Sequence, residues 1–200
     1  MSSTVLTMSM SLDGFITGPN DGPDNGLGDG GERLHEWIFQ GSGDHPREAV
    51  GGSKGVNSRI VDEFMSTGAV ITGRRTFDAA DGWGGDHHDG VPIYVLSHNP
   101  APAWAANWPA VHYMSDLEAA FREAKHAAGG KNVLVHGASS AQRALTAGLL
   151  DELEIHLVPV LLGDGRRLFE HLGIEQRQLE RIRVLEGEGG VTHLRYRVRR

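Results

Sequence analysis

Cysteine is absent from the 200 residues of this chain, which excludes disulfide bonds, thiolate metal ligands and a cysteine nucleophile. Any redox chemistry must therefore come from a bound cofactor. No run approaches the roughly 20 apolar residues of a membrane-spanning helix, and residues 1–10 lack the features of a signal peptide, so we expect a cytoplasmic protein. The net charge of -7 argues against general nucleic-acid binding, which requires a basic surface.

The remaining composition is that of a globular protein, and its size predicts a single domain over residues 1–200. Short apolar runs alternate with helical patterns along most of the chain, which predicts an α/β fold. The runs at 4–10, 69–72, 92–96 and 131–135 are typical of interior strands in a largely parallel sheet, and 111–113 is a further short candidate.

Helices are expected at residues 57–66, from 115 onward and at 140–149, because apolar residues there repeat at helical spacing. Their candidate caps are, in chain order, Asn57 or Ser58, the capping-box pair Ser115 and Glu118, and the capping-box pair Ser139 and Gln142.

The C-terminal part of the chain reads as three strands. The apolar run at 153–162 contains Pro159, which predicts an edge position or a bulge. The runs at 181–185 and 191–198 are separated by a glycine-rich turn and predict a closing antiparallel hairpin.

Residues 18–56 are rich in glycine, aspartate and asparagine and contain one short helical patch at 32–39. A segment this long with so few core residues is usually a functional lid or a disordered insertion. We expect a lid beside the ligand.

Gly137, Ala138, Ser139 and Ser140 lie between a predicted strand and a predicted helix. Free backbone N–H groups and the helix dipole make such a helix start a candidate phosphate site. An ordinary tight turn with a serine cap explains the same residues equally well.

Two other predicted strands end in residues suited to phosphate. Gly73, Arg74, Arg75 and Thr76 follow one strand and Ser97 follows the next. Guanidinium groups at the carboxyl end of a strand suit phosphate oxygens. The alternative is a pair of solvated charges on a surface loop, because no Rossmann or P-loop glycine motif is present.

These segments, in their order and spacing, resemble the dihydrofolate-reductase superfamily, including the C-terminal reductase domain of the riboflavin-biosynthesis deaminase-reductase. The matching segments are Ser11–Ile16, Gly73–Phe77, Val95–Ser97, Val135–Ala138, Leu149–Leu153 and Pro159–Gly165. The resemblance covers nearly the whole chain and implies a central twisted mixed sheet of about eight strands with helices on both faces.

The resemblance implies NADPH as cofactor. Arg74, Arg75, Thr76 and Ser97 would hold the 2′-phosphate and adenosine side, and residues 137–140 the pyrophosphate. The family often has two glycines joined by a cis peptide where this chain has Gly137 and Ala138. The nicotinamide would lie near the Asp13 turn, and riboflavin-branch relatives imply a homodimer.

The chemistry implied is hydride transfer to a C=N or C=O group of a pterin- or aminopyrimidine-like substrate, as in 5-amino-6-(5-phosphoribosylamino)uracil reductase or dihydrofolate reductase. The folate-reducing enzymes have a carboxylate near the position of Asn57, and an amide cannot act as the acid. Asp13 is our candidate catalytic residue, and it is equally well explained as a turn former. Glu32, Glu36, Asp62 or an ordered water are alternatives.

Trp37 and Trp83 are candidates for stacking on a flat heterocycle or covering it, as is Trp104, although each is more often a packing residue. The run Asp86–Asp89 contains two histidines and two aspartates, which favours a rival hypothesis of a metal-dependent hydrolase. Histidines in such a loop are commonly only solvated. A third hypothesis is an NADP-binding module without turnover.

Overall fold

A computed structural model describes residues 2–22, 24–39, 55–173 and 176–199 of the chain. Its main feature is an eight-stranded mixed sheet with the order β5-β4-β3-β6-β1-β7-β10-β9. The strands are β1 (Thr4–Ser11), β3 (Ala69–Gly73), β4 (Ile93–Leu96), β5 (Val111–Met114), β6 (Val133–His136), β7 (Glu152–Val158), β9 (Leu179–Glu186) and β10 (Thr192–Val198). The six strands from β5 to β7 are parallel and the last two are antiparallel, so the expected fold class and the closing hairpin are confirmed.

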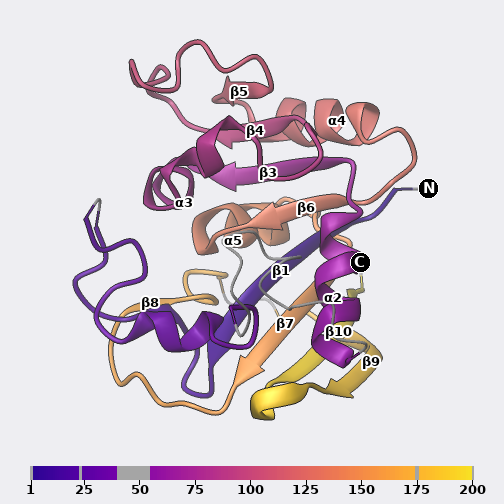
Figure 1. The fold of residues 1–200 in the computed structure, drawn as a ribbon. Helices are drawn as coiled ribbons and strands as arrows, with labels where there is room; N and C mark the ends of the chain where they lie inside the picture. Colours follow the sequence, from indigo (N-terminus) through magenta and orange to yellow (C-terminus); the bar gives the residue numbers. More distant parts are fainter. Residues whose placement is uncertain (1, 23, 40–54, 174–175, 200) are drawn as a thin grey trace.

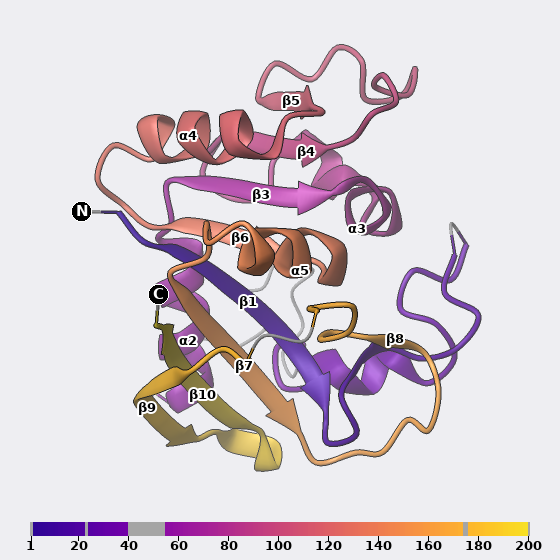
Figure 2. The same ribbon diagram turned by 180° about the vertical axis from the view of Figure 1, so that it is seen from behind.

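Helices cover both faces of the sheet. The α-helices are α2 (Val56–Met65), α3 (Arg74–Ala79), α4 (Leu117–Ala127) and α5 (Ala138–Thr146), and the short 3-10 helices are η1 (Gly31–His35), η2 (Asp81–Gly85) and η3 (Glu188–Gly190). Helix α2 crosses in front of the sheet in Figure 1, and α4 and α5 lie in front of it in the reverse view of Figure 2.

Alternation along the strands explains the two covered faces. Val70 and Leu134 point to the face of α3, whereas Ile71, Val133 and Val135 pack with α4 and α5 on the other side. All five are fully buried. Strands buried on both faces read as continuous apolar runs, which is why the sequence reveals them.

The sequence did not reveal every element. A second, two-stranded sheet pairs β2 (Phe15–Thr17) with β8 (Arg166–Arg167), and these strands are too short for a hydrophobic period. Helix α3 was also missed, because residues 74–79 offer less than two helical turns of pattern.

Strand β7 ends at Val158, so the expectation of a strand over 153–162 was too long. Pro159 lies after the strand, and β7 is an interior strand between β1 and β10. The edge position expected from Pro159 is therefore wrong. The proline directly follows the last residue of the strand, where its missing N–H breaks no hydrogen bond of the sheet.

All three cap expectations need correction. The cap of helix α4 lies one residue later than the capping box predicts, since Asp116 rather than Ser115 accepts the N–H of Ala119 at 2.8 Å. Helix α5 follows Gly137 and has no side-chain cap, and Gln142 instead donates to the carbonyl of Leu168 at 3.0 Å.

The start of α2 depends on a distant residue. Neither Asn57 nor Ser58 is its cap, because the helix follows Gly55. The carboxylate of Glu188 accepts the N–H groups of Val56 and Asn57, each at 2.9 Å. Those hydrogen bonds, that of Asn57 first, lower the pKa of Glu188 below 4.5.

Charged residues lie between α2 and the sheet. Arg183 forms ion pairs with Glu63 at 2.6 Å and with Glu154 at 2.9 Å, and Arg195 lies within 3.3 Å of both carboxylates. Burial raises the pKa of Glu154 against the opposing effect of Arg183, so this carboxylate depends on its arginine partners for its charge.

The glycine-rich segment has a packed portion. Leu34, Trp37 and Ile38, in and after η1, are buried in a cluster with Ile60 and Val61 of α2. Residues 40–54 of the expected lid lie outside the described residues. Among the described residues, no helix is long and apolar enough to cross a membrane.

Candidate functional site

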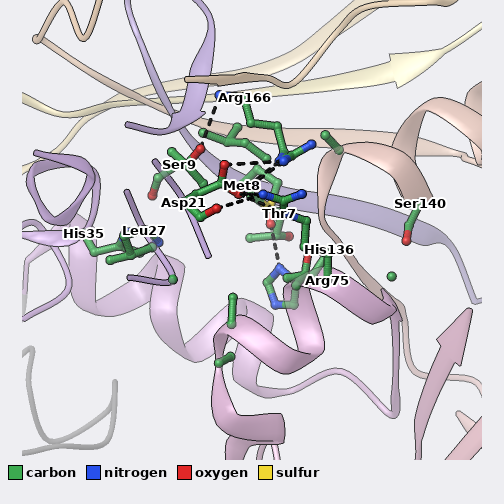
Figure 3. A pocket seen from close by; sticks show the side chains of 18 of the residues that line it. Thr7, Met8, Ser9, Asp21, Leu27, His35, Arg75, His136, Ser140 and Arg166 are labelled. Carbon is green, nitrogen blue, oxygen red and sulfur yellow. Dashed lines mark hydrogen bonds and ion pairs between the residues drawn. The ribbon is translucent and has the colours of Figure 1, made fainter. Parts of the chain in front are cut away.

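A cavity of about 650 Å³ opens at the carboxyl ends of the parallel strands, between the sheet and the glycine-rich segment. It is reached by β1, β3, β6 and β7, and β6 lies between β1 and β3 although it follows both in sequence. Open α/β sheets bind ligands at such an edge, where the strand order reverses. Figure 3 shows its wall, with residues of β1, α3 and the segment around Asp21 facing one another.

The structure brings most of the candidate site residues to this cavity. The lining residues among them are Gly73, Arg74, Arg75, Thr76, Ala138, Ser139, Ser140, Trp37 and Trp83. Asp13, Asn57, Ser97 and Gly137 are not among the lining residues.

The two expected phosphate turns are in direct contact. A Cβ atom at Gly137 would overlap the hydroxyl of Thr76, and one at Gly73 would lie 3.1 Å from Oγ of Ser140. Gly137 has φ 88° and ψ 147°, a region open to glycine alone. These two glycines allow the start of α3 and the start of α5 to meet at one end of the cavity.

The start of α5 fits an anion on the evidence of this structure. No side chain among the described residues caps its first turn, so within that part of the chain its backbone N–H groups are left for another partner. The hydroxyl of Ser140 is buried on the cavity wall without a hydrogen-bond partner among the described residues. The described peptide bonds are all trans, including the one between Gly137 and Ala138.

Both candidate arginines already have carboxylate partners. Arg74 binds Asp78 at 2.7 Å and donates to the carbonyl of Pro100 at 3.2 Å. Arg75 and Arg166 both reach Asp21, at 2.9 Å and 3.2 Å (Figure 3). Asp21 belongs to the glycine-rich segment, so these ion pairs connect that segment to the two arginines on the cavity wall.

Ser97 turns back on its own loop. Its hydroxyl donates to the carbonyl of Asn99 at 2.9 Å and accepts the N–H of the same residue at 3.0 Å. Leu96, the residue before it, lines the cavity instead.

Asp13 holds a turn. Its carboxylate accepts the hydroxyl of Ser11 at 2.6 Å and the N–H groups of Leu162 and Gly163 at 3.2 Å and 2.7 Å. Desolvation acts to raise its pKa, but these hydrogen bonds outweigh that effect and keep the pKa below 3.8. The alternatives Glu32, Glu36 and Asp62 are exposed and do not line the cavity.

The histidines of the Asp86–Asp89 run are part of the packed structure rather than solvated. His88 is buried and lies 3.2 Å from the carbonyl of Thr67. Its Nδ1 lies 2.7 Å from Nδ1 of His87, whose Nε2 lies 3.1 Å from Nε2 of His136. In the described part of the chain, no group of histidine, aspartate and glutamate side chains could hold a metal ion, so the metal-centre hypothesis gains no support.

His87 and His136 both line the cavity. His136 lies with Nδ1 3.0 Å from the carbonyl of Thr7, and a carbonyl only accepts, so Nδ1 carries the hydrogen (Figure 3). Burial, partly offset by that hydrogen bond, lowers the pKa of His136 to about 4. In a neutral His136, Nε2 is therefore an acceptor, and it faces Nε2 of His87.

The tryptophans take different positions. Trp37 is buried and donates its Nε1 hydrogen to Oγ of Ser9 at 2.9 Å. Trp83 contacts the ring of His87, with 4.7 Å between centroids. Trp104 stacks on Phe77 at 5.7 Å and does not line the cavity.

Sequence reasoning missed several polar lining residues. They are Thr7, Ser9, Asp21, His35, His136, Arg143, His156 and Arg166. His87 was considered only as a candidate metal ligand. His136 is the last residue of β6, and Ser9 and His156 are polar residues in the carboxyl-terminal halves of β1 and β7, so their strand positions were a usable signal. Thr7 lies earlier in β1 and Arg166 in the two-residue β8, and the others lie in loops or helices, so they have no such local signal.

Comparison with solved structures supports the fold. A proposed riboflavin biosynthesis protein from Shewanella sp. PV-4 is 20% identical, with a TM-score of 0.72 over 99% of both chains. A pyrimidine reductase-like protein from Corynebacterium diphtheriae is 16% identical, with a TM-score of 0.62 over 100% of this chain and 92% of that one. Dihydrofolate reductase from Enterococcus faecalis, solved with NADP(H), is 13% identical, with a TM-score of 0.59 over 99% and 97%.

At the level of sequence, no curated protein matches the chain. The model of one protein family does match it, over residues 3–192, and that model describes the RibD C-terminal domain. The match covers every strand of the sheet up to the start of β10 and the whole of the cavity wall. The chain therefore belongs to the RibD C-terminal domain family.

Proposed function

We propose that this protein is an NADPH-dependent reductase that acts on a C=N or C=O group of a small pterin- or aminopyrimidine-like heterocycle. The family to which it belongs comprises reductases that use NAD(P)H. The observation that carries the proposal is the junction of the two phosphate turns, where the uncapped start of α5 and the unpartnered hydroxyl of Ser140 lie beside Arg74 and Arg75.

The residues present fit the cofactor. The first turn of α5 and Ser140 would hold the pyrophosphate, because backbone N–H groups and a hydroxyl donate to phosphate oxygens. Arg74 and Arg75 would hold the 2′-phosphate, for which Arg75 would exchange Asp21 as its partner. When bound, the cofactor supplies the hydride.

Reduction of a C=N group also consumes a proton. Asp13 does not line the cavity, whereas His87 and His136 do, and their Nε2 atoms lie 3.1 Å apart. We assign proton delivery to this histidine pair, whereas Asp13 holds its own turn and the 162–163 loop. By the family resemblance we also expect a homodimer, which light scattering on the purified protein tests.

The test is a calorimetric titration with NADPH and NADH in parallel. The wild type should bind NADPH in the micromolar range and NADH much more weakly. Replacing both Arg74 and Arg75 by alanine should remove most of that difference, because only NADPH carries the 2′-phosphate. Arg122→Ala, an exposed site on α4, is the matched charge control and should change neither affinity.

Equal losses of NADPH and NADH in the double variant would contradict the assignment of the arginines. Binding of NADPH without its consumption in the presence of dihydropterin, dihydrofolate or aminopyrimidine substrates would favour a binding module without turnover. The amide of Asn57, in place of the carboxylate of folate-reducing enzymes, is the residue that favours this second candidate.

A further inference from the structure

The side chain of Asn57 is fixed by what surrounds it. Its Nδ2 lies 3.2 Å from the carbonyl of Trp37 and 3.1 Å from the carbonyl of Glu188, and both carbonyls can only accept. The nitrogen must therefore occupy that side. Its Oδ1 then faces Nε2 of His193 at 3.0 Å, which assigns a hydrogen to that ring nitrogen.

The assignment passes from His193 to His156. The two residues are directly opposite each other on β10 and β7, and their Nδ1 atoms are 2.9 Å apart. A neutral ring with hydrogen on Nε2 accepts at Nδ1, so His156 must donate from its own Nδ1. Nε2 of His156 is then left with a bare lone pair.

Both rings are neutral for a physical reason. Burial, followed by the effect of His193, lowers the pKa of His156 well below 6.5. Burial, followed by the charge of Arg183, lowers the pKa of His193 to about 4, against the opposing effects of Glu188 and Glu63.

The ring that carries the bare nitrogen lies in the wall of the cavity, and the nitrogen itself is buried. His156 is 2% exposed, lines the cavity, and its Nε2 has no hydrogen-bond partner among the described residues. A buried acceptor without a donor is unfavourable, so a donor group in the cavity would be favoured. The ring of Trp37 lies beside it, with 4.5 Å between centroids.

A hydrogen donor lies on the neighbouring strand. Ser9 is the β1 residue paired with His156 in the register of β1 and β7, and it also lines the cavity. Its Oγ already accepts the Nε1 hydrogen of Trp37, so the remaining hydroxyl hydrogen is left to donate. An acceptor and a donor thus stand side by side, at about the 4.8 Å spacing of neighbouring strands.

We propose that Nε2 of His156 accepts an N–H hydrogen of the substrate while Ser9 donates to the adjoining carbonyl, so that the site recognises the lactam edge of a planar heterocycle. His193 and Asn57 are positioning residues that fix the tautomer of His156. The proposal rests on the proposed function for the substrate's place in the cavity, and it assigns a recognition role to residues outside the two phosphate turns.

The first test needs no ligand. Two-bond proton–nitrogen NMR on protein with ¹⁵N-labelled histidine distinguishes a bare ring nitrogen from a protonated one. His156 should have a bare Nε2 and His193 a protonated Nε2, with signals assigned from His156→Gln and His193→Gln variants. In His193→Gln, His156 should no longer be held in one tautomer. A protonated Nε2 on His156 in the wild type would overturn the proposal.

The second test uses pterin and N3-methylpterin as probes, in the presence of NADP⁺. The wild type should bind pterin about 10- to 100-fold more tightly, because methylation removes the N–H that meets His156. His156→Leu should bind both ligands with equal, weakened affinity and should keep its NADPH affinity. His156→Gln should retain part of the preference, since its amide oxygen can accept.

The outcomes separate the two proposals. Loss of NADPH binding in the wild type would defeat the proposed function, whereas the histidine tautomers would still report on His156. Normal NADPH binding with no binding of pterin, or with a preference for pterin that survives in His156→Leu, would defeat the lactam assignment alone. His126→Leu, an exposed histidine on α4, is the control and should leave both affinities unchanged.

Discussion

Replacing Gly137 by alanine tests whether contact between the two phosphate turns requires glycine. The alanine would have to adopt the positive φ of 88° found at Gly137, and its Cβ would also overlap the hydroxyl of Thr76. The backbone part should cost about 1–3 kcal/mol. The steric part should cost about a further 1–3 kcal/mol, because Thr76 must rotate or its helix must shift.

Gly130 provides a matched control. Its φ is 95°, and a Cβ there would meet nothing within 4 Å. Gly130→Ala should therefore cost only the backbone part, about 1–3 kcal/mol. Combining Gly137→Ala with Thr76→Ala should remove most of the steric part and bring the cost close to that of Gly130→Ala, with a coupling of about 1–3 kcal/mol between the two sites.

The measurement is the free energy of unfolding in urea for the wild type, the three single variants and the double variant. NADPH affinity is measured on the same proteins, and it should fall in Gly137→Ala and stay unchanged in Gly130→Ala, since only the former displaces the start of α5. If Gly137→Ala costs no more than Gly130→Ala, or if Thr76→Ala gives no relief, the contact between the turns is not what requires glycine.

Three further substitutions test separate parts of the structure. Asp13→Asn should lower the free energy of unfolding by about 1 kcal/mol, because its hydrogen bonds to the 162–163 loop become weaker, and it should leave kcat unchanged. A fall in kcat at equal stability would restore Asp13 as a catalytic residue. Arg183→Met should cost about 3–5 kcal/mol in urea unfolding, because Glu154 would be buried without its main partner, whereas a cost under 1 kcal/mol would contradict that dependence. Glu188→Gln should reduce stability at pH 7 but not at pH 3. The pKa of Glu188 is lowered in the folded state, so its carboxylate contributes stability above pH 4.5 that is lost as the pH falls through the folded-state pKa. Equal losses of stability at both pH values would refute the cap.

The sequence determined most of the sheet and the position of one candidate anion-binding turn. Interior strands such as 69–73 and 133–136 are buried on both faces, so each appears as a short apolar run whatever lies around it. Gly137 follows such a strand and precedes a helix, and this local order is enough to indicate an anion site.

The tertiary structure decided which polar groups meet. Glu188 caps a helix that begins more than 130 residues earlier, and Asp21 reaches both Arg75 and Arg166. The sequence shows no pattern for these contacts, because each depends on the path of a loop and on the registers of distant strands.

The tautomer of His156 is the clearest case of this division. Local pattern determines that residue 156 lies in a strand, because its neighbours are apolar and the ladder of β7 follows. The ring nitrogen that carries its hydrogen is determined by His193, 37 residues away, and the tautomer of His193 is determined in turn by Asn57. The packing of α2 beside β10 brings Asn57 and His193 together. Hydrophobic periodicity is a property of neighbouring residues and survives in the sequence, whereas the direction of a hydrogen bond is a property of atoms that only the folded chain brings within 3 Å of each other.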